Sequence, residues 1–258
     1  MRDLDLLIDA ARSAGDIATH FHETGAKSWD KADGAGPVTE ADLAVNDMLE
    51  DRLRSARPGY GWLSEESTDD PARLDAETVF IIDPIDGTRS FVDGARTWAH
   101  SLAIVRNGAV QAGVIYLPLR DMLFAAEASN GASLNGAPLT VSSAPDLDAA
   151  HVLATRPNMD AKHWKDGVVP RFERHHRPSL AYRLGLVAQG RFDAMITLRP
   201  SWEWDIAAGA LIAAEAGGYV SDKTGAALRF NNPDPRLNGV IAAGRTMHDS
   251  LRARLAHA

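Results

Sequence analysis

The sequence contains no cysteine. That absence excludes a disulfide, a thiolate zinc site and a cysteine nucleophile. No run of apolar residues approaches the roughly 18 that a membrane-spanning helix needs. The N-terminal stretch MRDLDLLIDAARSAGD alternates charged and apolar residues, so it also lacks the unbroken apolar segment of a signal peptide. We therefore expect a cytoplasmic protein without a membrane segment.

The chain also lacks an excess of positive charge. Its 27 basic residues are outnumbered by 35 acidic residues, which gives a formal net charge of −8. Such a field does not favour a nucleic acid polymer or an anionic membrane surface as a partner. A small anionic molecule could still bind if local cations or metal ions compensate its charge. The 258 residues suffice for one large domain or two smaller ones.

The first part of the chain begins with two predicted helices. Apolar residues at helical spacing predict a helix over residues 3–23. Thr39 fits the N-cap of a second helix, with Asp42 completing a capping-box pattern at the third helical position. Pro58 and Gly59 are expected to end that helix.

An antiparallel sheet is predicted to follow these helices. The buried strand TVFIID (78–83) is expected to stop at Pro84. Asn107-Gly108 fits the tight turn of a hairpin between strands at 99–105 and 110–117. The stretch LFAAEAS indicates a further strand of the same sheet.

The pattern changes near residues 141–150, where VSSAPDLDAA is typical of a linker. Strands and helices alternate beyond it, as in an α/β arrangement. We therefore predict two parts of the chain: an N-terminal α+β half over residues 1–145 and a C-terminal α/β half over residues 146–258.

The stretch DPIDGT contains the most informative carboxylates. Asp83 and Asp86 lie three positions apart, just after a predicted strand. Two carboxylates that leave a strand end together commonly hold a hard cation such as Mg²⁺. Gly87 and Thr88 then open a short helix, whose free backbone N–H groups can bind an anion. The alternative is an acidic turn that is merely solvated.

Two further carboxylates strengthen the case for a metal site. Glu65 lies with Glu66 in the upstream loop LSEES. Asp205 lies in the first turn of an otherwise apolar helix, WEWDIAAG, where its charge is out of pattern. The helix dipole also favours an aspartate at this position, so a purely structural role stays open. A cation site beside an anion site is what hydrolysis of a phosphate ester requires.

The motifs LSEES, DPIDGT and WEWDIAAGALIAAEAGG, with VTEADL upstream, resemble those of the inositol monophosphatase superfamily. The resemblance covers roughly residues 5 to 250, and the combination of DPIDGT with the WD motif is highly specific. It implies a layered α-β-α-β-α sandwich that combines α+β and α/β parts. It also implies a Mg²⁺-dependent phosphomonoesterase, often inhibited by lithium and frequently a homodimer.

The resemblance further implies which residues hold two or three Mg²⁺ ions. Glu65, Asp83 and the backbone carbonyl of Ile85 are expected to hold the first ion. Asp83, Asp86 and Asp205 are expected to hold the second. One departure from the family pattern is a serine at position 64, where many members have glycine before the glutamate pair.

The same resemblance assigns the remaining parts of the reaction centre. The backbone N–H groups of Gly87 and Thr88 are expected to bind the substrate phosphate. Asp42 is expected to pair with the Thr88 hydroxyl and, together with Glu65, to orient the attacking water. The loop over residues 27–38 is a candidate lid that could complete the metal site.

The candidate substrate-binding residues lie in the second half of the chain. The basic segment RFERHHRPSLAYR (171–183), which includes Ser179 and Arg183, could hold a second phosphate or a nucleotide. The alternative for this segment is a solvated basic loop. In the family that the chain resembles, residues around the WD motif border the substrate hydroxyls, so the resemblance implies this role for Glu203, two positions before Asp205.

The form SWEWD resembles the 3′(2′),5′-bisphosphate nucleotidase branch of the superfamily more than the inositol-specific members. Trp202 and Trp204 could stack on a base, although packing in the core is the more frequent role of tryptophan. We therefore predict hydrolysis of adenosine 3′,5′-bisphosphate to AMP. Inositol 1-phosphate, histidinol phosphate and fructose 1,6-bisphosphate remain alternative substrates.

An alternative of a different class is a catalytically silent protein that binds metal or phosphate and regulates a partner. Each position that the resemblance marks as catalytic carries the required residue type, which argues against that alternative. We expect a small-molecule phosphate ester, and no nucleic acid polymer or membrane, as the partner of this chain.

Overall fold

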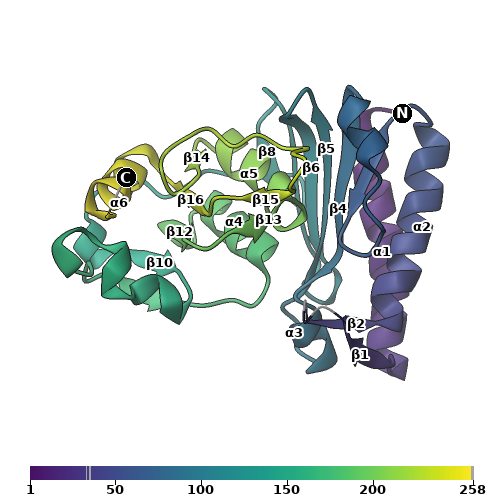
Figure 1. Ribbon diagram of the computed structural model, residues 1–258, viewed down its shortest axis with the longest axis horizontal. Helices are drawn as coiled ribbons and strands as arrows, with labels where there is room; N and C mark the ends of the chain where they lie inside the picture. The colour runs from purple at the N-terminus through teal and green to yellow at the C-terminus, as the bar shows by residue number, and fades with distance from the viewer. Residues whose placement is uncertain (33, 35, 257–258) are drawn as a thin grey trace.

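The computed structural model describes residues 1–32, 34 and 36–256. Figure 1 shows the chain as successive layers in the order helix, sheet, helix, sheet, helix. Helices α1 and α2 cover one face of a seven-stranded sheet, and α4 and α5 lie between this sheet and a five-stranded one. Helix α6 lies on the outer side of the second sheet. The layered α-β-α-β-α sandwich predicted from the sequence is thus confirmed.

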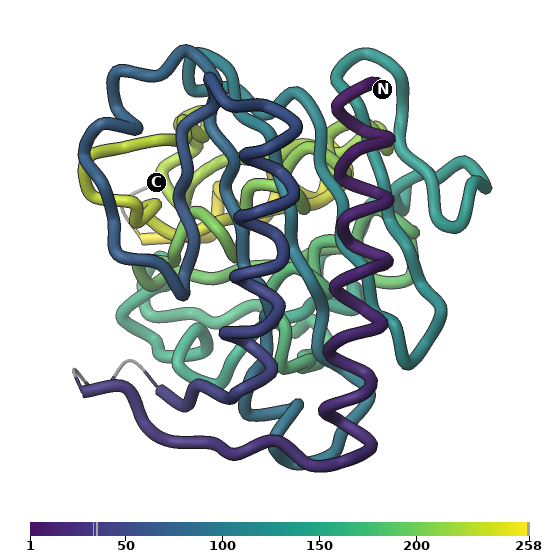
Figure 2. The backbone as a smooth tube through the Cα atoms, turned by 90° about the vertical axis from the view of Figure 1, so that its right-hand side faces the viewer, coloured from purple at the N-terminus to yellow at the C-terminus, as the bar shows by residue number. Residues whose placement is uncertain are grey.

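The outer helices form as their sequence pattern predicts. Helix α1 spans Asp3–Thr24 and α2 spans Glu40–Ala56. Figure 2 shows them side by side against the sheet. Thr39 caps α2, and its backbone N–H donates to Asp42 Oδ2 at 2.8 Å, which completes the capping box. Pairing of this kind satisfies donors that the first turn of a helix leaves free.

The seven-stranded sheet has the order β3-β4-β5-β6-β7-β8-β9. Strands β3 and β4 are parallel, and the other neighbouring pairs are antiparallel. The bounds are β3 Gly61–Ser64, β4 Thr78–Asp86, β5 Ala99–Arg106, β6 Ala109–Leu117, β7 Met122–Glu127, β8 Ala132–Leu134 and β9 Ala137–Pro138.

One predicted strand end was wrong. Strand β4 continues past Pro84 to Asp86, whereas the sequence analysis ended it at residue 83. Asp83 pairs with Ser101 and Asp86 with Ala99, so β4 holds one extra residue between these pairs. Proline is tolerated at such a bulge because it needs to donate no ladder hydrogen bond there.

The five-stranded sheet has the order β11-β10-β12-β16-β14. Strand β10 is parallel to both β11 and β12, whereas β16 is antiparallel to β12 and β14. The bounds are β10 His151–Leu153, β11 Glu173–His175, β12 Ala194–Thr197, β14 Tyr219–Ser221 and β16 Val240–Ala243. Strand β11 was not predicted, because the segment 171–183 has the composition of a basic loop.

Two short strand pairs and several short helices complete the described chain. The antiparallel pairs are β1 Ser28–Asp30 with β2 Pro37–Thr39, and β13 Ser201–Trp202 with β15 Arg236–Leu237. The remaining α-helices are α3 Thr88–Val92, α4 Leu180–Ala188, α5 Glu203–Glu215 and α6 Arg245–Arg254. The 3₁₀ helices are η1 Pro71–Asp75, η2 Pro118–Arg120, η3 Leu147–Ala149, η4 Arg156–Met159, η5 Ala161–His163 and η6 Lys165–Gly167.

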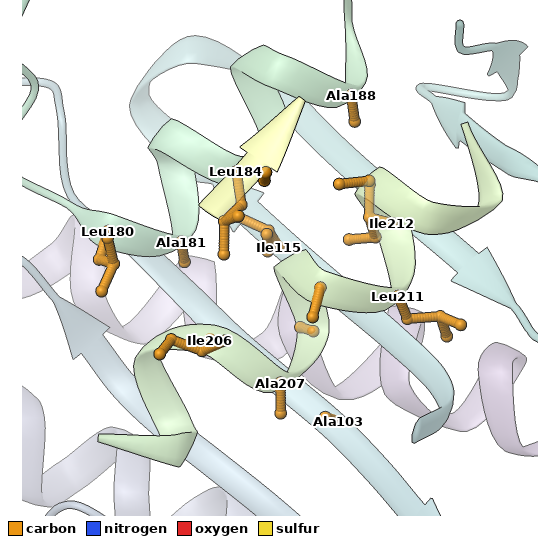
Figure 3. Packing of buried hydrophobic residues seen from close by; sticks show 14 of the residues in the cluster. Ala103, Ile115, Leu180, Ala181, Leu184, Ala188, Ile206, Ala207, Leu211 and Ile212 are labelled. Carbon is orange, nitrogen blue, oxygen red and sulfur yellow. The ribbon is translucent and has the colours of Figure 1, made fainter. Parts of the chain in front are cut away.

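The central layer places α5 in close contact with both its neighbours. Figure 3 shows Ile206, Ala207 and Ile212 of α5 among apolar residues of α4 and the seven-stranded sheet. A Cβ built on Gly113 of β6 would lie 2.9 Å from Ala208 Cα in α5. This glycine therefore lets the helix backbone approach the strand directly.

The position of α5 explains why most of its sequence is apolar: it is packed on two sides. Because α4 and α5 pack on the seven-stranded sheet, the second part of the chain shares a core with the first. The boundary predicted near residue 145 stays a prediction. Among the described residues, no helix combines the length and apolar character that crossing a bilayer requires.

Candidate active site

The centre of the site is Asp83, at the bulge of β4. Its side chain is buried, and neither carboxylate oxygen has a hydrogen-bond partner within the described residues. An isolated buried carboxylate is costly, so this side chain needs a partner that the described residues do not supply. Burial, and then the charges of Glu65 and Asp86, raise the pKa of Asp83 well above its ordinary value.

Three carboxylates from three separate elements meet at this point. Oxygen atoms of Glu65, Asp83 and Asp205 lie within 4.8 Å of one another. Glu65 follows β3, Asp83 lies on β4, and Asp205 lies in the first turn of α5. Burial, then the charges of Asp86 and Glu65, raise the pKa of Asp205 well above its ordinary value. Like charges at this spacing repel one another unless a cation lies among them.

Asp86 adds a fourth carboxylate, which the N-terminus of α4 holds in place. The Ser179 hydroxyl donates to Asp86 Oδ2 at 2.7 Å, and the Ala181 backbone N–H donates to the same oxygen at 2.6 Å. Burial raises the pKa of Asp86 to about 6, against these two hydrogen bonds and the charge of Arg183. Since both donors address Oδ2, the other oxygen is left for a different ligand.

Ser179 therefore acts as a support for Asp86, which gives a first prediction. Replacing Ser179 with alanine should raise the Mg²⁺ concentration for half-maximal activity by about 10- to 100-fold, the effect typical of losing a group that orients a metal ligand. Loss of the α4 cap should also cost about 1 kcal/mol of stability. A Mg²⁺ titration of phosphatase activity and a thermal melt measure the two effects.

The control for this prediction is Ser250→Ala. That serine donates only to the Thr246 carbonyl within α6, so its loss should leave the Mg²⁺ requirement unchanged. If Ser179→Ala also keeps the wild-type Mg²⁺ requirement, Asp86 does not depend on this support.

Gly87 and Thr88 form the predicted turn into a short helix. Gly87 has φ 98° and ψ 40°, a left-handed conformation that favours glycine, and α3 begins at Thr88. The Thr88 hydroxyl donates to the Ile85 carbonyl at 3.1 Å and lies 3.3 Å from Asp42 Oδ1. The predicted contact between Thr88 and Asp42 is therefore present, and it lies beside the bulge of β4.

Asp42 has two roles in this arrangement. Its Oδ2 accepts the Thr39 backbone N–H and hydroxyl, while Oδ1 faces Thr88. Burial, more than the nearby charge of Glu65, raises the pKa of Asp42 to about 6. The same carboxylate thus caps α2 and extends the hydrogen-bonded chain toward the cluster.

Lys31 is a site residue whose role the sequence analysis missed. Its Nζ lies 2.9 Å from Glu65 Oε1 and 2.7 Å from Glu66 Oε1. Burial raises the pKa of Glu66 to about 7, against the hydrogen bond from Lys31. In the sequence this lysine is only one of several charges in a polar loop, so nothing marks its contact.

The predicted lid over residues 27–38 includes residues 33 and 35, which lie outside the described residues. The described part contains the antiparallel pair of β1 and β2, and Lys31 follows β1 directly. A loop that contacts Glu65 is placed as a lid would be. Its closing role stays a prediction.

The structure does not bring Glu203 to the carboxylate cluster. Its side chain is fully buried, and its two oxygens accept the Asn231 N–H at 2.6 Å, the Asn232 N–H at 2.9 Å and the Asn232 amide at 2.6 Å. Glu203 thereby fixes a turn of the chain. The expectation that it borders the substrate hydroxyls finds no geometric support.

Arg183 is likewise occupied by its own segment. The guanidinium donates to the carbonyls of Arg177 at 2.5 Å and Pro178 at 3.3 Å, and it lies 3.0 Å from His176 Nε2. Burial lowers the pKa of Arg183 to about 10. The charge of Arg183 acts on Asp86 from within the protein, so direct contact with substrate stays a prediction.

The donor set fits Mg²⁺. The groups that meet at the cluster are carboxylates, which are oxygen donors, and both oxygens of the buried Asp83 lack a hydrogen-bond partner among the described residues. Mg²⁺ prefers such hard oxygen ligands and is usually held by a few carboxylates. His100 is buried nearby with Nδ1 2.5 Å from the Pro84 carbonyl, so it supports the turn.

Comparison with known proteins gives one consistent result. The profile described as "Inositol monophosphatase family" matches residues 3–258. The chain is 35% identical over 252 residues to the Escherichia coli protein named Nus factor SuhB, covering 93% of this chain and 90% of that one. It is 33% identical over 254 residues to an inositol-1-monophosphatase of Mesorhizobium japonicum, covering 93% and 91%.

Solved structures agree with these relatives. An inositol monophosphatase of Thermotoga maritima superposes with a TM-score of 0.82 at 29% identity, covering 98% of this chain and 96% of that one. The SuhB protein of Bartonella henselae superposes with a TM-score of 0.81 at 30% identity, covering 96% of each chain. With the carboxylate cluster and its oxygen donors, these matches establish that the chain belongs to the inositol monophosphatase family and is a Mg²⁺-dependent phosphoric monoester hydrolase.

Proposed function

We propose that the chain hydrolyses the phosphate monoester of a compact polyol, with inositol 1-phosphate as the first candidate. The observation that best supports phosphomonoester hydrolysis is the meeting of Glu65, Asp83 and Asp205 within 4.8 Å, with Asp86 beside them. When bound there, Mg²⁺ ions neutralise the phosphate charge, activate a water and stabilise the leaving oxygen.

The chain's own residues then have separable roles in this proposal. The four carboxylates hold the cations, and the Ile85 carbonyl adds a neutral oxygen. The Asp42 carboxylate orients the Thr88 hydroxyl, which can in turn hold the attacking water in line with the phosphorus. Backbone N–H groups at Gly87 and Thr88 bind the phosphate oxygens. Positioning and charge neutralisation carry such a reaction without a covalent protein nucleophile.

A polyol ester is favoured over the bisphosphate nucleotide predicted from SWEWD. That prediction came from the likeness of SWEWD to the nucleotidase branch. Within this motif, Glu203 accepts hydrogen bonds from Asn231 and Asn232. The Trp202 and Trp204 rings, which could have stacked on a base, stack on each other with centroids 4.7 Å apart and an interplanar angle of 10°. The Mesorhizobium relative named an inositol-1-monophosphatase supports the same choice.

The name of the Escherichia coli relative, a Nus factor, does not change this proposal. The net charge of −8 provides no general attraction to nucleic acid. We therefore retain a small phosphate ester as the partner. The cytoplasmic location, the homodimer and inhibition by lithium likewise stay predictions.

The test is phosphate release in Mg²⁺ from four esters: inositol 1-phosphate, adenosine 3′,5′-bisphosphate, histidinol phosphate and fructose 1,6-bisphosphate. We expect the highest kcat/KM with inositol 1-phosphate. Asp86→Asn protein, prepared in parallel, measures any contaminating phosphatase. A preference for the nucleotide would overturn the polyol proposal. Absence of turnover with all four, in protein that still binds Mg²⁺, would favour the silent regulator.

A further inference from the structure

Outside the carboxylate centre, one more group of metal-ligating side chains converges within the described residues: His151, Glu173 and His175. His151 begins strand β10, and the other two residues begin and end β11. Figure 1 places β10 at the left of the molecule, far from β4 and its carboxylates. This group therefore needs an explanation independent of the phosphatase reaction.

The pairing of the two strands places the three side chains on one face. In the parallel register His151 lies opposite Glu173, and Leu153 lies opposite His175. Residues two apart on a strand point to the same side of a sheet, so Glu173 and His175 share the side on which His151 lies. The contacts confirm this, because all three side chains touch one another.

The distances among the three groups match a tetrahedral metal site. His151 Nδ1 lies 3.0 Å from His175 Nε2. Glu173 Oε2 lies 3.3 Å from His151 Nδ1, and Glu173 Oε1 lies 3.2 Å from His175 Nε2. Zinc bonds of about 2.0–2.1 Å at tetrahedral angles place neighbouring ligand atoms about 3.3–3.4 Å apart. A small adjustment of the side chains would therefore place one ligand atom from each of the three residues at bonding distance from one ion.

The backbone around the group is fixed from several directions. The His151 N–H donates to Asp193 Oδ2 at 2.8 Å, and the Asp193 N–H donates to the His151 carbonyl at 2.9 Å. The Glu173 N–H donates to the Ala150 carbonyl at 2.8 Å, and the Ala154 N–H donates to the His175 carbonyl at 2.9 Å. The strands thus hold the ligands in register before any ion arrives.

We propose that His151, Glu173 and His175 form a second divalent-metal site, of the zinc type, with solvent as the fourth ligand. Two imidazoles and one carboxylate suit Zn²⁺ and neighbouring transition metals, whereas Mg²⁺ prefers oxygen alone. The side chains of His151 and Glu173 are 53% and 64% exposed, which leaves the ion an open path and a water position. In this proposal the Mg²⁺ site lies at the seven-stranded sheet and the zinc-type site lies on the five-stranded sheet.

Zinc titration in excess Mg²⁺ tests the proposal, because Mg²⁺ then competes for the carboxylate centre. We expect wild-type protein to bind one more equivalent of Zn²⁺ than the His151→Ala/His175→Ala variant, measured by calorimetry and by competition with a chromophoric chelator. Asp83→Asn, which alters the carboxylate centre, should keep that equivalent. The matched control His20→Ala/His163→Ala removes two histidines outside the group and should also keep it.

A thermal melt supplies a second readout. Zn²⁺ bound between β10 and β11 should raise the melting temperature of the wild type and not that of the His151→Ala/His175→Ala variant. Circular dichroism shows whether the variant is folded. Equal Zn²⁺ binding and equal thermal shifts in the folded variant and the wild type would overturn the proposal. So would absence of Zn²⁺ binding by the wild type, which would leave only a hydrogen-bonded cluster.

Discussion

Replacing Asp83 with asparagine is expected to lower phosphatase activity by about 10³-fold while leaving the metal-free protein at least as stable as the wild type. Activity falls because this carboxylate is the one predicted to contact both ions. Stability is kept because Asp83 is buried with both oxygens unpaired, beside other carboxylates. A neutral amide of nearly the same shape removes the repulsion and the cost of burying a charge.

Two measurements on the same protein check this expectation. Activity is assayed with Mg²⁺, and melting temperatures are compared with and without Mg²⁺. Mg²⁺ at about 100 times its dissociation constant should stabilise the wild type by about 2.7 kcal/mol, and the variant by much less. The control is Asp51→Asn, which makes the same change of a carboxylate to an amide at an exposed position of α2. It should behave as the wild type. A variant that is less stable than the wild type without metal would show that the Asp83 carboxylate has a partner inside the protein.

Replacing Gly113 with valine is expected to lower the free energy of unfolding by about 3 kcal/mol or more, and the melting temperature by about 6–12 °C. The new Cβ would lie 2.9 Å from Ala208 Cα and 3.0 Å from its carbonyl oxygen. These are backbone atoms, so they cannot move aside as a side chain would. Helix α5 must shift away from β6, and it carries Asp205 with it.

Thermal and urea unfolding measure the loss, and the Mg²⁺ requirement of the remaining activity reports the displacement of Asp205. The control is Gly59→Ala, because a Cβ there meets no atom within 4 Å. That control should change stability by well under 1 kcal/mol. Wild-type stability in Gly113→Val would mean that α5 and β6 are not in such close contact.

Three carboxylates that were named from the sequence, Glu65, Asp83 and Asp205, meet in the structure. Asp83 and Asp86 lie in one short stretch, on either side of the bulge in β4. Asp205 was detected as a charge in an apolar helix, and the position of α5 between the two sheets (Figure 1) explains that contrast. Local patterns drew attention to these residues, and the resemblance to a known family supplied their expected roles as metal ligands.

Residues whose roles depend on distant contacts were harder to predict. Lys31 meets Glu65 across 34 positions, and nothing in its own loop indicates that contact. Glu203 was assigned to the substrate because the resemblance places residues around the WD motif there, whereas its side chain accepts a hydrogen bond from Asn231, 28 positions downstream. Neighbours in sequence can point to opposite sides of a helix turn, so sequence proximity to a site is weak evidence for contact with it.

The separation of Asp86 from its supports has a consequence for biosynthesis. Its two donors lie 93 and 95 positions downstream, and the Ser101 hydroxyl donates to the Trp204 carbonyl across 103 positions. A nascent chain whose first sheet has already formed holds Asp83 and Asp86 without Asp205 or the N-terminus of α4. Such a ribosome-bound intermediate lacks the complete set of ligands for Mg²⁺. Mg²⁺ therefore binds late in folding, after the elements that carry Asp205 and the N-terminus of α4 have packed against the first sheet.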